Sequence, residues 1–148
     1  MRMMFAALAL ALLAGSADAE TLRKGALTLS DMAVRATPAG LPTSAAYLTI
    51  ENHGKSPDKL LSIDCPCAAS AMMHETRTQN GVSSMSMVNE LTIPAGGKVQ
   101  FKPDGLHVML VGLKGPLKAG QTQAMTLRFQ KAGTVKAPFA VKDVIPAR

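Results

Sequence analysis

The sequence is poor in aromatic residues, and its basic residues form no run. Among 148 residues there are no tryptophans, one tyrosine and four phenylalanines, while the formal net charge is +6 with the lysines and arginines scattered. Stacking of nucleic-acid bases needs aromatic side chains on a basic surface, so we expect no nucleic-acid partner. We interpret the charge as favouring solubility and as steering the protein toward an acidic partner.

Long apolar runs are also absent after the first fifteen residues. The run at residues 5–15 follows Arg2 and precedes Ala17-Asp18-Ala19, a small-x-small pattern. This arrangement is typical of a secretory signal peptide cleaved after Ala19. Spanning a bilayer takes roughly 20 apolar residues, and no run reaches that length. We therefore expect residues 1–19 to be removed and residues 20–148 to be exported as a soluble protein without membrane insertion.

Helical periodicity is weak after residue 20. Short runs of alternating apolar residues recur instead, with turn residues between them, and Asn80-Gly81 is a strong hairpin turn signal. Regularly spaced strands without intervening helices indicate a sandwich or barrel. The sequence thus predicts an all-β, antiparallel Greek-key sandwich, and its length predicts a single domain over residues 20–148.

One predicted strand combines packing residues with possible metal ligands. In the stretch GLHVML, residues 105–110, His107 and Met109 alternate with Val108 and Leu110. Successive side chains of a strand point to opposite faces, so His107 and Met109 share one face while Val108 and Leu110 point to the core. We expect the first pair on the outer or rim face, near the start of the strand.

A second histidine and methionine lie upstream on either side of the Asn80-Gly81 turn. A hairpin there would bring His74 close to Met85. Two imidazoles and two thioethers suit Cu(I) and are poor ligands for zinc, calcium or magnesium. A thioether has no proton to lose and forms no disulfide, so it stays available in an oxidising compartment. Copper held this way is retained yet exchangeable, as a carrier requires.

These motifs resemble the periplasmic copper chaperone family PCuAC over nearly the whole mature chain. The segments AAYLTIENHG, DKLLSI, HET, NGV, IPAGG, LHVMLVGLKGPL and LRFQKAG follow in the family's order, and His-x10-Met-x21-His-x-Met is its copper motif. The resemblance implies a cupredoxin-like domain that binds one Cu(I) through His74, Met85, His107 and Met109. It also implies a periplasmic carrier, not an enzyme. The implied partners are a copper-receiving membrane oxidase subunit, typically of the binuclear copper centre of cytochrome c oxidase, and another copper chaperone. We expect a monomer.

The two cysteines in the segment Cys65-Pro66-Cys67 form a pair that departs from the family pattern. It is open to three interpretations: a disulfide closing a very small loop, a thiolate pair that relays copper, and a redox pair one residue shorter than Cys-x-x-Cys. We favour a structural or redox-labile pair outside the main site. The pair also supports an alternative function, a thiol-disulfide oxidoreductase that keeps a partner's copper-binding cysteines reduced. A blue-copper electron carrier would need a cysteine beside His107 and Met109, and none is there.

The remaining histidine and methionines have simpler interpretations. Met72 shares the face of His74, and Met87 that of Met85, so both are auxiliary candidates that we expect to be surface neighbours rather than ligands. Methionine in an apolar strand usually fills the core. The residues expected in the core are Met32, Met73 and Met125, and His53 in its turn is expected to be structural or solvated.

Overall fold

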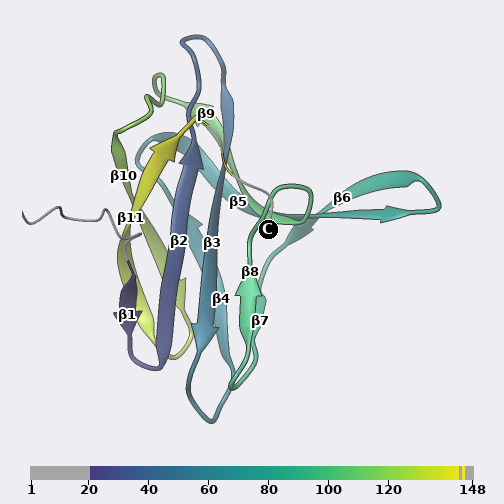
Figure 1. The fold of residues 1–148 in the computed structure, drawn as a ribbon, viewed down its shortest axis with the longest axis vertical. Coiled ribbons are helices and arrows are strands. Elements are labelled where there is room, and N and C mark those ends of the chain that lie inside the picture. Colours follow the sequence, from purple (N-terminus) through teal and green to yellow (C-terminus); the bar gives the residue numbers. More distant parts are fainter. Residues whose placement is uncertain (1–20, 144, 146–148) are drawn as a thin grey trace, which may run out of the picture.

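A computed structural model describes residues 21–143 and Ile145, so the predicted signal peptide at residues 1–19 lies outside the described residues. The described chain contains eleven strands (Figure 1). They are β1 (Leu22–Lys24), β2 (Leu27–Arg35), β3 (Thr43–Asn52), β4 (Asp58–Asp64), β5 (Ala68–Gln79), β6 (Val82–Val88), β7 (Leu91–Ile93), β8 (Lys98–Gln100), β9 (Leu106–Leu113), β10 (Thr122–Phe129) and β11 (Gly133–Lys142). None of these described residues forms a helix long and apolar enough to cross a membrane.

The strands follow the order β6-β5-β9-β3-β2-β11-β10-β4-β7, with β1 paired to β2 and β8 paired to β3. This arrangement confirms the predicted all-β sandwich and is consistent with a cupredoxin-like Greek key. The expectation of a purely antiparallel sheet is wrong at one place, because β2 and β11 pair in parallel, with Ala33 opposite Ala140. Parallel neighbours need a long crossover connection. The strands between β2 and β11 supply it.

A continuous apolar core fills the sandwich. Strand alternation places Leu29, Ile50 and Leu110 inside, each 0–1% exposed. Burying side chains of this kind stabilises the fold by about 1.5–3 kcal/mol each. The three methionines expected in the core, Met32, Met73 and Met125, are buried, which confirms that interpretation.

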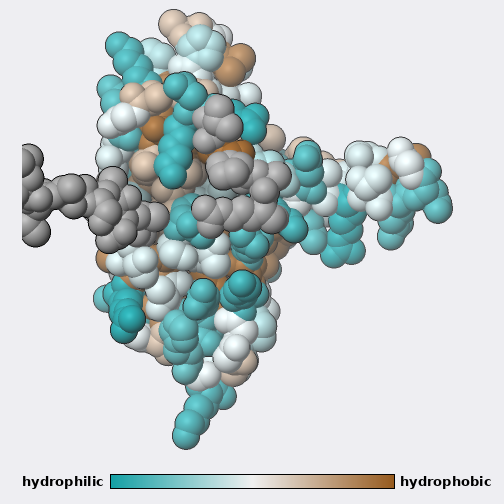
Figure 2. All heavy atoms as spheres, in the orientation of Figure 1, coloured by the Kyte–Doolittle hydropathy of each residue, from teal (hydrophilic) through white to brown (hydrophobic). Residues whose placement is uncertain are grey.

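Strands β5 and β6 form a long hairpin that stands clear of the body as an arm (Figures 1 and 2). The predicted turn is confirmed: Asn80 and Gly81 have φ of 53° and 77°, the positive values that a tight two-residue hairpin turn requires. The base of β5 pairs with β9 while its outer half pairs only with β6. The arm therefore joins the sandwich at the segment that contains His74.

Candidate metal centre

The strand register brings His74 and His107 together. Strands β5 and β9 are antiparallel, and His74 lies directly opposite His107. Their ring centroids are 5.9 Å apart, with the ring planes at 80° in an edge-to-face arrangement. Residues directly opposite each other in a sheet project to the same face. Thirty-three positions separate the two histidines in the chain, and only the pairing of β5 with β9 makes them neighbours.

The arm supplies Met85 to the same place. Met85 lies opposite Thr76 in the β5–β6 register, one pleat away from His74. Its side chain reaches diagonally, and Sδ comes within 3.2 Å of His74 Nδ1. Two donors that each lie about 2.0–2.3 Å from one metal ion are roughly 3–4 Å apart. The spacing of this pair is therefore suited to a shared ion.

Met109 completes the group. It lies two residues after His107 on β9, hence on the same face, with Met72 opposite it on β5 and Ala45 opposite it on β3. The structure thus gathers all four sequence-predicted residues on one face, over β6, β5 and β9. Their role as ligands stays a prediction.

The position of His107 differs from the exposed rim that the sequence suggests, because His107 is only 7% exposed. The loop before β9 is fastened to β5: the Thr76 N–H donates to the Gly105 carbonyl at 3.2 Å. The same carbonyl lies 2.9 Å from His107 Nδ1. A carbonyl can only accept, so Nδ1 carries the hydrogen and Nε2 keeps a free lone pair. The loop before β9 thereby selects the nitrogen available to a metal.

The donor set contains imidazole and thioether and no carboxylate. Within residues 21–143, no three of His, Cys, Asp and Glu gather in a way that could hold a metal ion. Glu75 follows His74, but alternation turns it to the opposite face, where its carboxylate pairs with Arg77 at 3.1 Å. Calcium, magnesium and zinc favour oxygen, thiolate or several imidazole ligands, whereas neutral soft donors favour Cu(I). The residues present therefore fit Cu(I).

Cys65 and Cys67 form a disulfide in the turn between β4 and β5. Cys65 is buried, and its Sγ accepts a hydrogen bond from the Cys67 N–H at 3.2 Å. His74 lies seven residues further along, roughly 20 Å away for an extended strand. The pair lies just before the first residue of β5 and is separated from the candidate metal centre in the middle of that strand, in agreement with the favoured interpretation that it lies outside the site.

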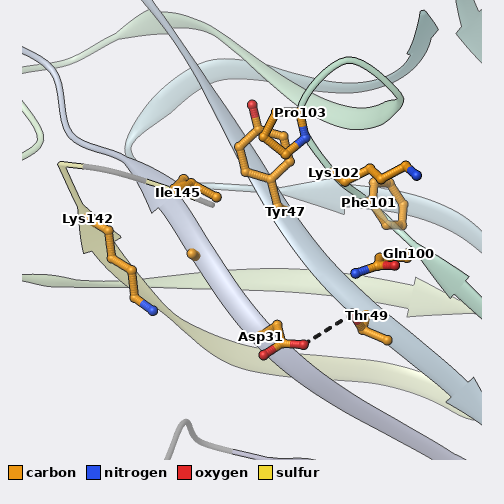
Figure 3. A pocket seen from close by; sticks show the side chains of 10 residues that line it. Asp31, Tyr47, Thr49, Gln100, Phe101, Lys102, Pro103, Lys142 and Ile145 are labelled. Carbon is orange, nitrogen blue, oxygen red and sulfur yellow. Dashed lines mark hydrogen bonds between the residues drawn. The ribbon is translucent and has the colours of Figure 1, made fainter. Parts of the chain in front are cut away.

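Two other features lie outside this donor group. His53 sits in the turn between β3 and β4, where Nε2 is 3.1 Å from Thr28 Oγ1 and 3.6 Å from the Glu51 carboxylate. A polar pocket, which the sequence did not indicate, lies beside Tyr47, and in it the Thr49 hydroxyl donates to Asp31 at 3.4 Å (Figure 3). Neither imidazole nor thioether is found among the described residues lining the pocket. It therefore lacks the donors of a copper site.

The fold is consistent with a cupredoxin-like domain, and the candidate metal centre lies at one edge of the sheet, where its donors suit a soft metal. A family model described as "Putative lipoprotein LpqE-like" matches residues 27–141, and the chain belongs to this family. A putative lipoprotein, Lxx21020 of Leifsonia xyli subsp. xyli (strain CTCB07), is 38% identical over 106 residues. That match covers 71% of this chain and 64% of the relative, so this chain spans less than two thirds of that protein's length.

Solved structures connect the family to copper chaperone domains. The solution structure of Cu(I)-bound DR1885 from Deinococcus radiodurans is 38% identical, with a TM-score of 0.65 and coverage of 89% of this chain and 87% of that one. The apo PCuAC domain of PmoF1 is 27% identical, with a TM-score of 0.72 and coverage of 84% and 100%. The resemblance to the PCuAC family is thereby confirmed.

Proposed function

We propose that this protein is a periplasmic Cu(I) carrier that binds one ion through His74, Met85, His107 and Met109. The observation that carries the proposal is the convergence of two imidazoles and two thioethers on one face, with His74 Nδ1 and Met85 Sδ 3.2 Å apart. The relative DR1885 was solved with Cu(I). Family relatives described as lipoproteins support export.

The graded exposure of the four residues supports carriage rather than permanent storage. Met85, on β6 of the arm, is 54% exposed, whereas His107 on β9 is only 7% exposed. A partner's ligands can reach and replace Met85 first, while His107 and its oriented Nε2 hold the ion until last. Because each replacement exchanges one soft donor for another, no step leaves the ion without ligands. The protein performs no bond chemistry, and we propose a binding protein rather than an enzyme.

The proposed recipient is a copper-accepting subunit of a membrane oxidase, with the binuclear copper centre of cytochrome c oxidase as the first candidate. This step rests on membership of the copper chaperone family. A net charge of +6 favours encounter with an acidic partner surface. We expect the carrier to act as a monomer and to receive copper from a second chaperone.

Titration of the reduced protein with Cu(I), in competition with a chromophoric chelator, tests the ligand set. Replacing His107 with alanine should weaken binding on the order of 100-fold or more, since a buried, oriented imidazole is lost. His53→Ala is the matched control, because His53 lies in an exposed turn away from the site. Unchanged affinity in both His107→Ala and Met109→Ala would exclude this assignment.

A thiol-disulfide oxidoreductase acting through Cys65 and Cys67 is the alternative function. The disulfide supports it, and Cys67 is partly exposed. The separation of the pair from the histidines argues that any such activity is independent of copper binding. Reduction of insulin by the wild type, compared with Cys65→Ser, distinguishes the two functions.

A further inference from the structure

The candidate centre belongs to a larger group of soft side chains on the same face. Besides the four predicted ligands, Met72 and Met87 project there: Met72 lies opposite Met109, and Met87 lies opposite His74. Opposite residues share a face. Three strands thus present two histidines and four methionines side by side at the base of the arm.

The strand register places a second set of soft side chains on the same face, two residues along the strands from the candidate centre. Strand β5 runs antiparallel to both β6 and β9. A step of two residues toward the start of β5 is therefore a step of two residues toward the ends of β6 and β9, and it reaches the next side chains on the same face. The set His74, Met85 and His107 becomes Met72, Met87 and Met109. Met85 reaches His74 across a diagonal between β5 and β6. The same diagonal, one pleat further along, joins Met87 to Met72.

Exposure separates these methionines from those that pack the core. Met87 is 56% exposed and Met72 is partly exposed, whereas Met73, between Met72 and His74, is 4% exposed. Met72 and Met87 also border the same surface hollow beside β4. Exposing a large thioether brings no burial energy, so packing does not account for the pair.

We propose that Met72, Met87 and Met109 form a second, all-thioether Cu(I) subsite, about 7 Å along the strands from the first. The inference rests on the proposed function, because its role is to hold Cu(I) on entry to or exit from the first position. Three neutral thioethers bind Cu(I) and reject harder ions. Met109 belongs to both sets, so an ion can pass between the positions without losing this ligand. Lacking imidazole, the subsite binds more weakly than the first.

Methionine-methyl NMR of the mature protein, titrated with Cu(I) under reducing conditions, tests the subsite. Cu(I) is diamagnetic, and Met32, Met73 and Met125 are buried internal controls. The first equivalent should shift Met85 and Met109. Further Cu(I) should shift Met72 and Met87 while the controls stay in place. In a His74→Ala/His107→Ala variant, Met72, Met87 and Met109 should respond from the start.

A Met72→Leu/Met87→Leu variant is the matched control, since leucine keeps the volume and removes the sulfur. It should abolish the second phase and leave the affinity of the first unchanged. Wild-type protein in which excess Cu(I) shifts neither Met72 nor Met87 overturns the subsite and leaves the proposed function standing. Failure of the proposed function gives a different result, in which the first equivalent shifts neither Met85 nor Met109.

Discussion

The paired strands β5 and β9 have two faces that differ in burial: one packs in the core and the other is accessible. On the core face, Met73 lies opposite Val108, and both are at most 4% exposed. On the other face, Met72 lies opposite Met109, and both remain accessible. Adjacent methionines of one strand thus lie on two different faces, Met73 in the core and Met72 on the face of the candidate metal centre. The comparison shows that a strand's period of two lets stability and copper affinity be changed separately.

Neighbouring substitutions on β9 should separate the two faces most clearly. Met109→Leu keeps the side-chain volume but removes the thioether, so Cu(I) affinity should fall on the order of 10- to 100-fold with little change in stability. Val108→Ala should lower the free energy of unfolding by about 2 kcal/mol and leave affinity unchanged. Urea unfolding and Cu(I) competition titration measure the two effects. Equal losses of affinity in both variants would contradict the separation.

The adjacent methionines of β5 extend the test. Met73→Ala opens a cavity in the core and should cost about 2–5 kcal/mol of the free energy of unfolding. Met72→Ala removes an accessible side chain and should change stability by no more than about 0.5 kcal/mol. Thermal and urea unfolding of the apo proteins give the comparison directly. A large loss of stability in Met72→Ala would show that Met72 packs as core.

A further contrast is between the disulfide before β5 and the candidate metal centre in the middle of that strand. Replacing Cys65 and Cys67 together with serine should lower the free energy of unfolding by about 1–2 kcal/mol, because the loop that the disulfide closes is very short. Binding of one Cu(I) should be unchanged, since the turn lies far from His74. Native mass spectrometry with reductant and Cu(I) reports stoichiometry and oligomeric state together. Loss of the single bound copper would place the cysteines in the site.

The smallest effect concerns Tyr47, on strand β3. Burial raises its pKa above the ordinary value of 10.0, while Arg35 lowers the pKa and Asp104 raises it. A raised pKa favours the protonated folded state, so this contribution to stability is present below about pH 10 and is lost as the pH rises further. Tyr47 is the sole tyrosine in a chain without tryptophan, so ultraviolet absorbance reports it alone.

Asp104→Asn gives the control for that titration. Removing the negative charge should lower the midpoint of Tyr47 ionisation, and asparagine tolerates the positive φ of 64° found at this residue. A midpoint below 10.0 in the wild type would contradict the burial of the phenol. Copper affinity near neutral pH should be the same in both proteins.

Local pattern was enough to predict much of the molecule. Alternation in GLHVML separated His107 and Met109 from the packing residues Val108 and Leu110, and Asn80-Gly81 marked the hairpin that brings Met85 to His74. These features depend on residues close in sequence, where the backbone period and turn geometry act directly. The core methionines followed from the same alternation.

Other features required the pairing of distant strands. The parallel contact of β2 with β11 joins segments from the two ends of the described chain, and no local signal encodes it. The orientation of the His107 ring likewise depends on a loop carbonyl that accepts a hydrogen bond from Thr76 of another strand.

The sequence by itself determined the kinds of donor present and the face to which each strand presents them, because both follow from residue type and a two-residue period. Only the tertiary structure decided that His74 faces His107, that Met72 and Met87 lie on the same face one pleat away, and that Cys65 and Cys67 form a disulfide before β5. Register between strands is set by packing of the whole core rather than by any one segment.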